Sequence, residues 1–124
     1  MIRKYRPEDY ELISEWWSYH KAVSPPKIIL PETGLIKDDI CASFMYTVEN
    51  KIGFIAWTVS NPTSRHKDIY DGVKDITKMF IEKARADSIM IIFTTTDVIG
   101  LSRLYESCGF TNCSKQSSEL IFKV

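Results

Sequence analysis

Apolar and polar positions near the start of the chain predict a short strand followed by a helix. Residues 1–5 suit a first strand, and Pro7 with Glu8 and Asp9 has the chemistry of a helix first turn. The next apolar positions recur at i, i+1, i+4, i+5 and i+8 on one helical face, and they are Leu12, Ile13, Trp16, Trp17 and His20. This spacing gives His20 a structural place beside the tryptophans.

Three extended runs come next and predict an antiparallel meander. They cover residues 33–37, 40–49 and 51–60, with a tight turn expected at Asn50 and Lys51. Alternating positions in the last two runs carry aromatic and β-branched side chains, which favour strands: Phe44, Tyr46, Val48, Ile55, Trp57 and Val59. The sequence therefore indicates a sheet in this part of the chain.

A long helix and a buried strand are expected after the meander. From residue 68 to about residue 86, apolar residues recur at helical spacing, with Asp68 expected at the N-cap. Residues 89–93 form a continuous apolar run, which is typical of a strand buried on both faces. We expect this strand, within residues 88–96, at the centre of the sheet.

The last part of the chain predicts a shorter helix and a terminal hairpin. An apolar face over residues 101–108 marks the helix, and Gly109 is placed to end it in the left-handed conformation. A strand then begins at Phe110, and the alternating residues 119–124 predict a final edge strand or hairpin partner. The order of strand, helix, three antiparallel strands, helix, buried strand, helix and hairpin predicts an α/β fold.

Composition and charge narrow the classes of protein. With 124 residues and 44% apolar content, the chain suits a single domain over residues 1–124. Sixteen basic and sixteen acidic side chains cancel, so no long-range field gathers nucleic acid or an anionic membrane. The longest apolar runs fall far short of the roughly 20 residues that span a bilayer, and the charged N-terminus lacks the apolar core of a signal peptide. We expect a cytoplasmic protein that binds neither nucleic acid nor membrane.

The cysteines do not indicate a metal centre. Cys41, Cys108 and Cys113 are odd in number, and none lies in a Cys-x-x-Cys pair or in metal-ligand spacing with the two histidines. We therefore expect three reduced thiols.

The most specific motif is Leu-Tyr-Glu-Ser-Cys-Gly-Phe at residues 104–110. Together with the order of elements, it resembles the GNAT N-acetyltransferase superfamily, whose last helix commonly ends in Leu-Tyr-Glu-x-x-Gly-Phe. Residues 33–36, 52–55 and 59–62 also resemble short GNAT-like proteins found among bacteriophages. The resemblance covers nearly the whole chain and implies a mixed sheet with an antiparallel meander and splayed central strands, flanked by three helices. It further implies transfer of an acetyl group from acetyl-CoA to an amine, without a metal.

The resemblance also implies where acetyl-CoA binds. In this family two strands splay apart next to a bulge, and the pantetheine arm fills the gap like an added strand. The corresponding strands here end near Ser60 and begin near Ser88. Backbone groups of the first strand would then face the pantetheine, and they belong to Trp57, Thr58, Val59 and Ser60. Ordinary sheet pairing is the alternative explanation for these residues.

The loop expected to hold the pyrophosphate departs from the family pattern. That pattern has Arg or Gln, two residues, Gly, one residue, then Gly or Ala, because amides approach phosphate closely only where no side chain intervenes. Aligned on Arg65, the two small positions are occupied by Asp68 and Tyr70, and the Asp68 carboxylate would compete for the amides. The loop keeps cationic or polar donors that could hold phosphates through side chains: Arg65, His66 and Lys67. A solvated loop is the alternative, and Gly72 could serve in a shifted register.

Acetyl transfer needs a deprotonated amine and a stabilised CoA thiolate. In many family members the tyrosine of the Leu-Tyr-Glu pattern protonates that thiolate, and Tyr105 matches it, so the resemblance implies Tyr105 as the general acid. A core tyrosine is the alternative, because Tyr105 shares a helical face with Leu101. Val98 stands where the family often has an Asn that touches the pantetheine. We assign no general base, and Glu32, Glu49 and Asp97 stay open.

Three functions are compatible with this sequence. The first is an acetyl-CoA-dependent N-acetyltransferase acting on a primary amine of a small molecule or protein. The second is a catalytically inactive binding or regulatory module of the same fold that acts on a partner protein. The third is a small α/β domain unrelated to acyl transfer. Residues 119–124 would otherwise form an exposed edge, which suggests a homodimer through the terminal strands.

Overall fold

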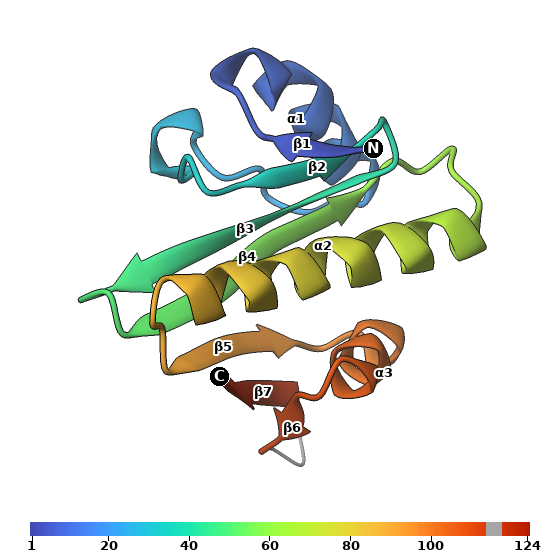
Figure 1. Cartoon of the computed structure of the whole chain (residues 1–124). Helices are drawn as coiled ribbons and strands as arrows, with labels where there is room; N and C mark the ends of the chain where they lie inside the picture. Colours follow the sequence, from blue (N-terminus) through green and yellow to red (C-terminus); the bar gives the residue numbers. More distant parts are fainter. Residues whose placement is uncertain (114–117) are drawn as a thin grey trace. The chain divides into compact units, whose positions relative to one another are not determined.

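The computed structural model describes residues 1–113 and 118–124 (Figure 1). In these residues seven strands form one mixed sheet in the order β1-β2-β3-β4-β5-β7-β6, accompanied by three α-helices. The predicted α/β class, a mixed sheet flanked by three helices, is confirmed. No helix within the described residues is both long enough and apolar enough to cross a membrane.

The chain divides into two compact units, which are described in turn. The first comprises residues 1–44 and 57–76, and the second comprises residues 45–56 and 77–124. Three elements contribute to both: β3 (Cys41–Val48), β4 (Ile52–Ser60) and α2 (His66–Ala86).

The first unit begins with strands that pair antiparallel. Its other elements are β1 (Ile2–Lys4), the 3₁₀ turns η1 (Pro7–Asp9) and η2 (Lys27–Ile29), α1 (Tyr10–Tyr19) and β2 (Leu35–Lys37). β1 pairs with β2, and β2 pairs with β3, both antiparallel. Asp9 fixes the entry to α1, because its carboxylate accepts hydrogen bonds from the Arg6 amide at 2.8 Å and from the Arg3 guanidinium at 2.7 and 2.8 Å.

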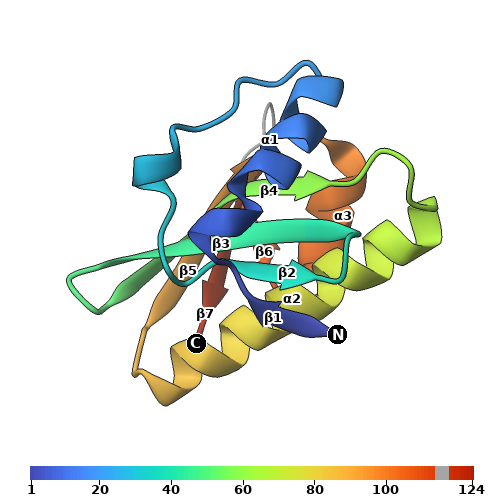
Figure 2. The same ribbon diagram turned by 90° about the horizontal axis from the view of Figure 1, so that it is seen from above.

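Helix α1 lies over the strands of this unit (Figure 2), and its aromatic side chains belong to the core. Ile13, Trp16 and Trp17 are buried, and they join a core formed with strand residues: Tyr5, Ile36, Ala42, Phe44 and Val59. The predicted stripe is wrong at Leu12, while His20 makes a structural contact outside the core. Leu12 is 44% exposed. His20 is also exposed, because it follows the last helical residue, and its ring contacts Ser60 instead of the core.

The second unit contains the only parallel strand pair among the described residues. Its further elements are β5 (Ile91–Thr96), α3 (Ile99–Ser107), β6 (Thr111–Asn112) and β7 (Ser118–Lys123). β4 pairs parallel with β5 from Ile52 and Ile91 to Ile55 and Thr94. β7 pairs antiparallel with both β5 and β6. The predicted hairpin is therefore confirmed, whereas the alternative of an edge strand at residues 119–124 is wrong, since β6 covers that side.

Two turns explain where strands and helices end in this unit. The β3–β4 hairpin turns at Glu49 and Asn50, whose φ values of 53° and 56° are those of a type I′ turn. The Lys51 amide closes it with a 3.0 Å bond to the Val48 carbonyl, so the turn lies one residue earlier than predicted. Gly109 has φ 103°, and the prediction that it ends α3 in a left-handed conformation is confirmed.

The apolar run before β5 is less buried than predicted. Ile89 and Ile92 are 3% and 0% exposed, but Met90 is 64% exposed. Within β5 buried residues alternate with half-buried ones, Ile91 and Phe93 among the latter, so the predicted burial of this strand on both faces is wrong. The central place of β5, between β4 and β7, is confirmed.

Candidate functional site

Strand β4 has an unusual backbone conformation at Trp57. Its φ of 59° lies in the left-handed region, which a bulky non-glycine residue rarely adopts. The strand nevertheless continues to Ser60. A single left-handed residue within a strand is the local signature of a bulge, and bulges are common next to active sites because they redirect backbone groups.

Side chains around this break pack within the first unit. The Trp57 ring meets the Trp17 ring edge-on, with centroids 6.4 Å apart and an interplanar angle of 83°. The Thr58 hydroxyl lies 2.7 Å from the Ser43 hydroxyl, and Val59 is 5% exposed. Since these side chains serve packing, the backbone is what residues 57–59 could offer to a ligand.

The exit from β4 is held by a set of polar contacts. The Nε2 atom of His20 lies 3.1 Å from the Ser60 carbonyl oxygen and 3.5 Å from the Ser60 hydroxyl. The Asn61 amide donates to the Ile40 carbonyl at 2.8 Å, while its side-chain oxygen accepts a 3.0 Å bond from the Thr63 amide. The second contact is an Asx-turn, which favours a change of chain direction. It leads the chain from β4 into the loop before α2.

Helix α2 begins two residues earlier than predicted. Its first residue is His66, and the Ile69 amide donates to the Arg65 carbonyl at 3.0 Å. The amides of residues 66–68 precede this first helical bond, so they belong to the set that a helix leaves without intrahelical acceptors. Such amides, with the helix dipole, make an N-terminus favourable for anions.

Asp68 lies inside the first turn of α2, so its predicted place as N-cap is wrong. Its carboxylate accepts a 3.1 Å hydrogen bond from Nε of Arg65. The side chains of Arg65 and Asp68 are 84% and 38% exposed. An ion pair this open to water contributes little stability, about 0 to 1 kcal/mol, and is readily exchanged for other partners. His66 and Lys67 are also exposed.

Gly72 has a packing reason in this structure. It lies in the second turn of α2 and is buried, and a Cβ atom there would come 2.7 Å from the Cys41 sulfur. Only glycine lets the helix approach β3 this closely. A role for Gly72 in a shifted phosphate-binding register stays a prediction.

Tyr105 lies in α3, in the second unit. Its side chain is 1% exposed, and its ring centroid is 5.3 Å from that of Phe110, with the planes tilted by 50°. Its carbonyl accepts a 3.1 Å bond from the Phe110 amide, which ties the end of α3 to the start of β6. Val98 is the N-cap of α3 and is 56% exposed, and its amide bonds to the Thr96 hydroxyl at 3.1 Å.

The expected site residues therefore fall into two groups. Residues 57–60 and 65–68 all lie in the first unit, and Tyr105 lies in the second. Sequence reasoning missed the left-handed Trp57, for which no glycine or asparagine gave a signal. The Asn-Pro pair at residues 61 and 62 is a turn signal in the sequence, and β4 does end there, at the Asx-turn of Asn61. Within residues 1–113 and 118–124, no cluster of three His, Cys, Asp or Glu side chains could hold a metal ion.

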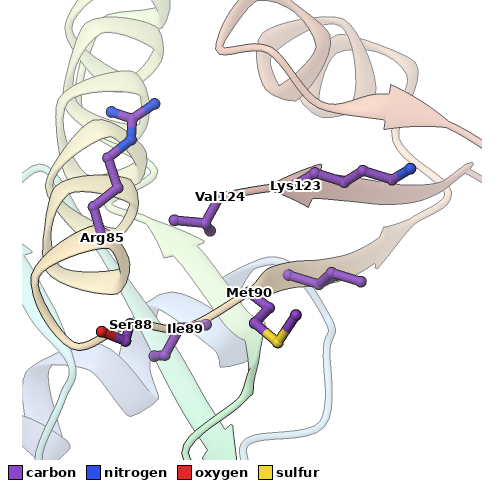
Figure 3. A pocket seen from close by; sticks show the side chains of 7 residues that line it. Arg85, Ser88, Ile89, Met90, Lys123 and Val124 are labelled. Atoms are coloured by element: carbon purple, nitrogen blue, oxygen red, sulfur yellow. The ribbon is translucent and has the colours of Figure 1, made fainter.

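A cavity of about 650 Å³ in the second unit does not form a convergent site (Figure 3). Its two cationic side chains, Arg85 and Lys123, point in different directions. The Arg85 guanidinium instead lies 5.6 Å from the Phe122 ring centroid, in cation–π range. We therefore do not treat this cavity as the functional site.

Sequence comparison identifies no relative for this chain. No family model matches it, and no curated protein matches it either.

Comparison of structures gives a clear result. Rv2747 from Mycobacterium tuberculosis, in complex with CoA and NLQ, superposes with a TM-score of 0.82 at 10% identity, covering 100% of this chain and 99% of that one. The NatC complex bound to Gag peptide and CoA gives 0.78 at 16% identity, covering 100% and 98%. Aminoglycoside 6′-acetyltransferase type Ii gives 0.76 at 8% identity, covering 99% and 96%. At these identities the likeness establishes a shared fold, that of acyl-CoA-dependent transferases.

Proposed function

We propose that this chain, which has the fold of the GNAT N-acetyltransferases, is an acetyl-CoA-dependent N-acetyltransferase. Its acceptor would be a primary amine of a small molecule or of a protein. Structural neighbours include both kinds, an aminoglycoside acetyltransferase and a complex bound to a peptide. The proposal treats residues 1–124 as one catalytic domain.

The left-handed Trp57 is the observation that supports this proposal most directly. Such a conformation fits a bulge within β4, which would interrupt regular pairing and could turn backbone groups toward a ligand. An extended pantetheine arm could then bind the backbone of residues 57–60 as an added strand. A residue other than glycine at φ 59° is strained by on the order of 1–3 kcal/mol. Strain of this kind is found most often at functional sites.

The start of α2 fits the diphosphate end of CoA. The amides of residues 66–68 precede the first helical bond, and three exposed donors surround them: Arg65, His66 and Lys67. Asp68 opposes phosphate binding, but its pairing with Arg65 already offsets part of its charge. Side-chain donors would thus replace the close backbone approach that small residues allow in the family.

The chemical step transfers the acetyl group from sulfur to nitrogen. The neutral acceptor amine attacks the thioester carbonyl carbon. The nitrogen, which becomes positively charged on attack, loses one proton to water, and the carbon–sulfur bond breaks. Tyr105 would donate its phenolic proton to the leaving thiolate and regain a proton from solvent. Packing against Phe110 holds the ring in one orientation, as a positioned general acid requires.

Calorimetric titration with acetyl-CoA tests this proposal. We expect micromolar binding, with desulpho-CoA binding comparably because it keeps the diphosphate, and free phosphate binding far more weakly. Arg65→Gln and Lys67→Gln should each weaken binding about three- to tenfold, as the loss of one charge-assisted hydrogen bond predicts. Lys51→Gln, in the exposed β3–β4 turn, is the matched control. Absence of binding at millimolar acetyl-CoA would refute the proposal that this chain is an N-acetyltransferase.

A second candidate is an inactive module of the same fold that binds a partner protein. Asp68 and Tyr70 favour it, because they occupy the positions at which the family has small residues. Tyr70 is 42% exposed, and the Lys74 Nζ atom lies 5.8 Å from its ring centroid, so an aromatic and charged surface replaces a bare amide loop. This candidate predicts that acetyl-CoA causes no thermal shift, whereas a donor at a hundred times its Kd stabilises by about 2.7 kcal/mol.

A further inference from the structure

The hydroxyl of Tyr5 is buried without a hydrogen-bond partner. Tyr5 is 8% exposed, and its ring meets Phe44 edge-on with centroids 5.0 Å apart. Among the described side chains, this hydroxyl is the one buried polar atom that lacks a partner. Buried polar groups are nearly always satisfied, so an exception needs a physical explanation.

Tyr5 also lines a cavity of about 370 Å³ in the first unit. The other lining residues are Pro7, Lys27, Ile28, Leu30 and Glu32. The segment that precedes Lys27 is anchored to α1, because the Tyr10 hydroxyl donates to the Pro25 carbonyl at 2.7 Å and the Ser14 and Ser24 hydroxyls lie 3.3 Å apart. The volume lies within the range of small-molecule sites.

The lining combines three kinds of chemistry. Pro7, Ile28 and Leu30 are apolar, and the aliphatic side chain of Ile28 is 92% exposed to solvent. Lys27 and Glu32 carry opposite charges, and within residues 1–113 and 118–124 neither makes an ion pair. Burial, with a further contribution from the negative charge of Asp9, raises the pKa of Tyr5, so the phenol stays protonated and can donate.

We propose that this cavity binds a free α-amino acid with an apolar side chain. The carboxylate would accept hydrogen bonds from the Tyr5 hydroxyl and from Lys27, while the ammonium would pair with Glu32. The aliphatic side chain would contact the apolar wall. The Tyr5 hydroxyl is buried in the free protein, so binding requires side chains of the lining to change rotamer, which is common on binding; Lys27, Ile28 and Glu32 are exposed and able to do so.

The site goes beyond acetyl transfer and does not depend on it. None of its lining residues belongs to the segments 57–60 and 65–68 that the donor proposal uses. Binding of an amino acid would therefore stand even if acetyl-CoA did not bind, and its failure would leave the donor proposal intact.

Calorimetric titration of the full chain with L-leucine, without acetyl-CoA, tests the site. We expect binding in the millimolar range or tighter. Three probes that each lack one group should bind about tenfold more weakly or not at all: isoamylamine without the carboxylate, 4-methylpentanoate without the ammonium, and glycine without the side chain. No heat at about 20 mM L-leucine, well above a millimolar Kd, would overturn the proposal.

Tyr5→Phe distinguishes two explanations of the unpartnered hydroxyl, a ligand site and an ordered water that already binds it. Removing an unpartnered hydroxyl should raise the Tm of the free protein by a few degrees, yet weaken L-leucine binding about tenfold. Lys27→Gln should weaken binding about threefold or more, and Lys51→Gln should leave it unchanged. A lower Tm for Tyr5→Phe would mean that the hydroxyl already has a water partner, and unchanged L-leucine affinity in Tyr5→Phe and Lys27→Gln would place any binding elsewhere. Either result contradicts the proposal.

Discussion

The end of α3 and the start of α2 differ in how closely they follow the GNAT pattern. At the end of α3 the Leu-Tyr-Glu-x-x-Gly-Phe run is intact, and Gly109 adopts φ 103° with a hypothetical Cβ only 2.9 Å from the Phe122 ring. At the start of α2 the small residues are replaced by Asp68 and Tyr70, yet the helix forms from His66 onward. The glycine at 109 is needed by the backbone itself, whereas small residues at 68 and 70 are needed only by a ligand. Loss of the second kind leaves the fold unchanged.

The largest effect is expected at Gly109. Gly109→Ala should destabilise the protein by about 2 to 4 kcal/mol, since alanine disfavours this φ and its Cβ would press on Phe122. Gly100→Ala, in the exposed first turn of α3 with open space around its Cα, should instead stabilise by about 0.5 kcal/mol. Urea unfolding measures both. Equal effects of the two substitutions would contradict the distinction drawn above.

Tyr105→Phe tests the role of the tyrosine in the intact run at the end of α3. If the phenol is the general acid, kcat should fall about a hundredfold while KM for acetyl-CoA changes little. The ring and its contact with Phe110 are kept, so the Tm should stay within a few degrees of the wild type. Turnover followed by release of free CoA thiol is the measurement. An unchanged kcat would make Tyr105 a core residue only.

Asp68→Asn tests the start of α2, where Asp68 replaces a small residue of the family pattern. Removing the carboxylate releases Arg65 and ends its repulsion of phosphate, so acetyl-CoA should bind about three- to tenfold more tightly. Asp71→Asn, at an exposed position three residues further along α2, should change the Kd for acetyl-CoA much less. Weaker binding in Asp68→Asn would show that the carboxylate supports the donor site instead of opposing it.

Asp9 gives the smallest effect, and it contrasts with the exposed Asp68. Its hydrogen bonds from Arg3 hold the pKa of the Asp9 carboxyl below its usual range. A carboxyl whose folded pKa is lowered stabilises above the unfolded value of about 4 and loses that contribution as the pH falls through the folded pKa.

Asp9→Asn should therefore be less stable than wild type by about 0.5 to 1 kcal/mol at pH 7, with the difference shrinking below pH 4. Unfolding by urea between pH 7 and pH 2 measures it, and Glu8→Gln, exposed in the same turn, is the control. A difference that persists at the lowest pH would mean that the carboxylate charge is not the cause.

Much of the fold follows from residue patterns that have one physical solution. Alternating aromatic and β-branched residues predicted the hairpin of β3 and β4, and Gly109 predicted the end of α3. The turn was misplaced by one residue because Glu49 and Asn50 both adopt left-handed conformations, and only Asn50 is a residue type that favours them. Helix α2 starts at His66, before Asp68, and no residue of the sequence marks that start.

The site was harder to predict, since its main features depend on tertiary context. Tryptophan has no preference for φ 59°, so packing against Trp17 and the surrounding sheet must maintain it. Gly72 suggested a phosphate loop, but its small size serves contact with Cys41. The cavity at Tyr5 is lined by residues that precede α1 and residues that follow it in the sequence, and no local sequence pattern links the two sets.

An NMR titration of the ¹⁵N-labelled protein with acetyl-CoA tests the central claim most directly, because it reports each amide separately. We expect shift changes to concentrate at residues 57–60 and 65–68, with the amides of 66–68 among the largest. Binding with shifts confined to other residues, or a spectrum unchanged at millimolar acetyl-CoA, would contradict it.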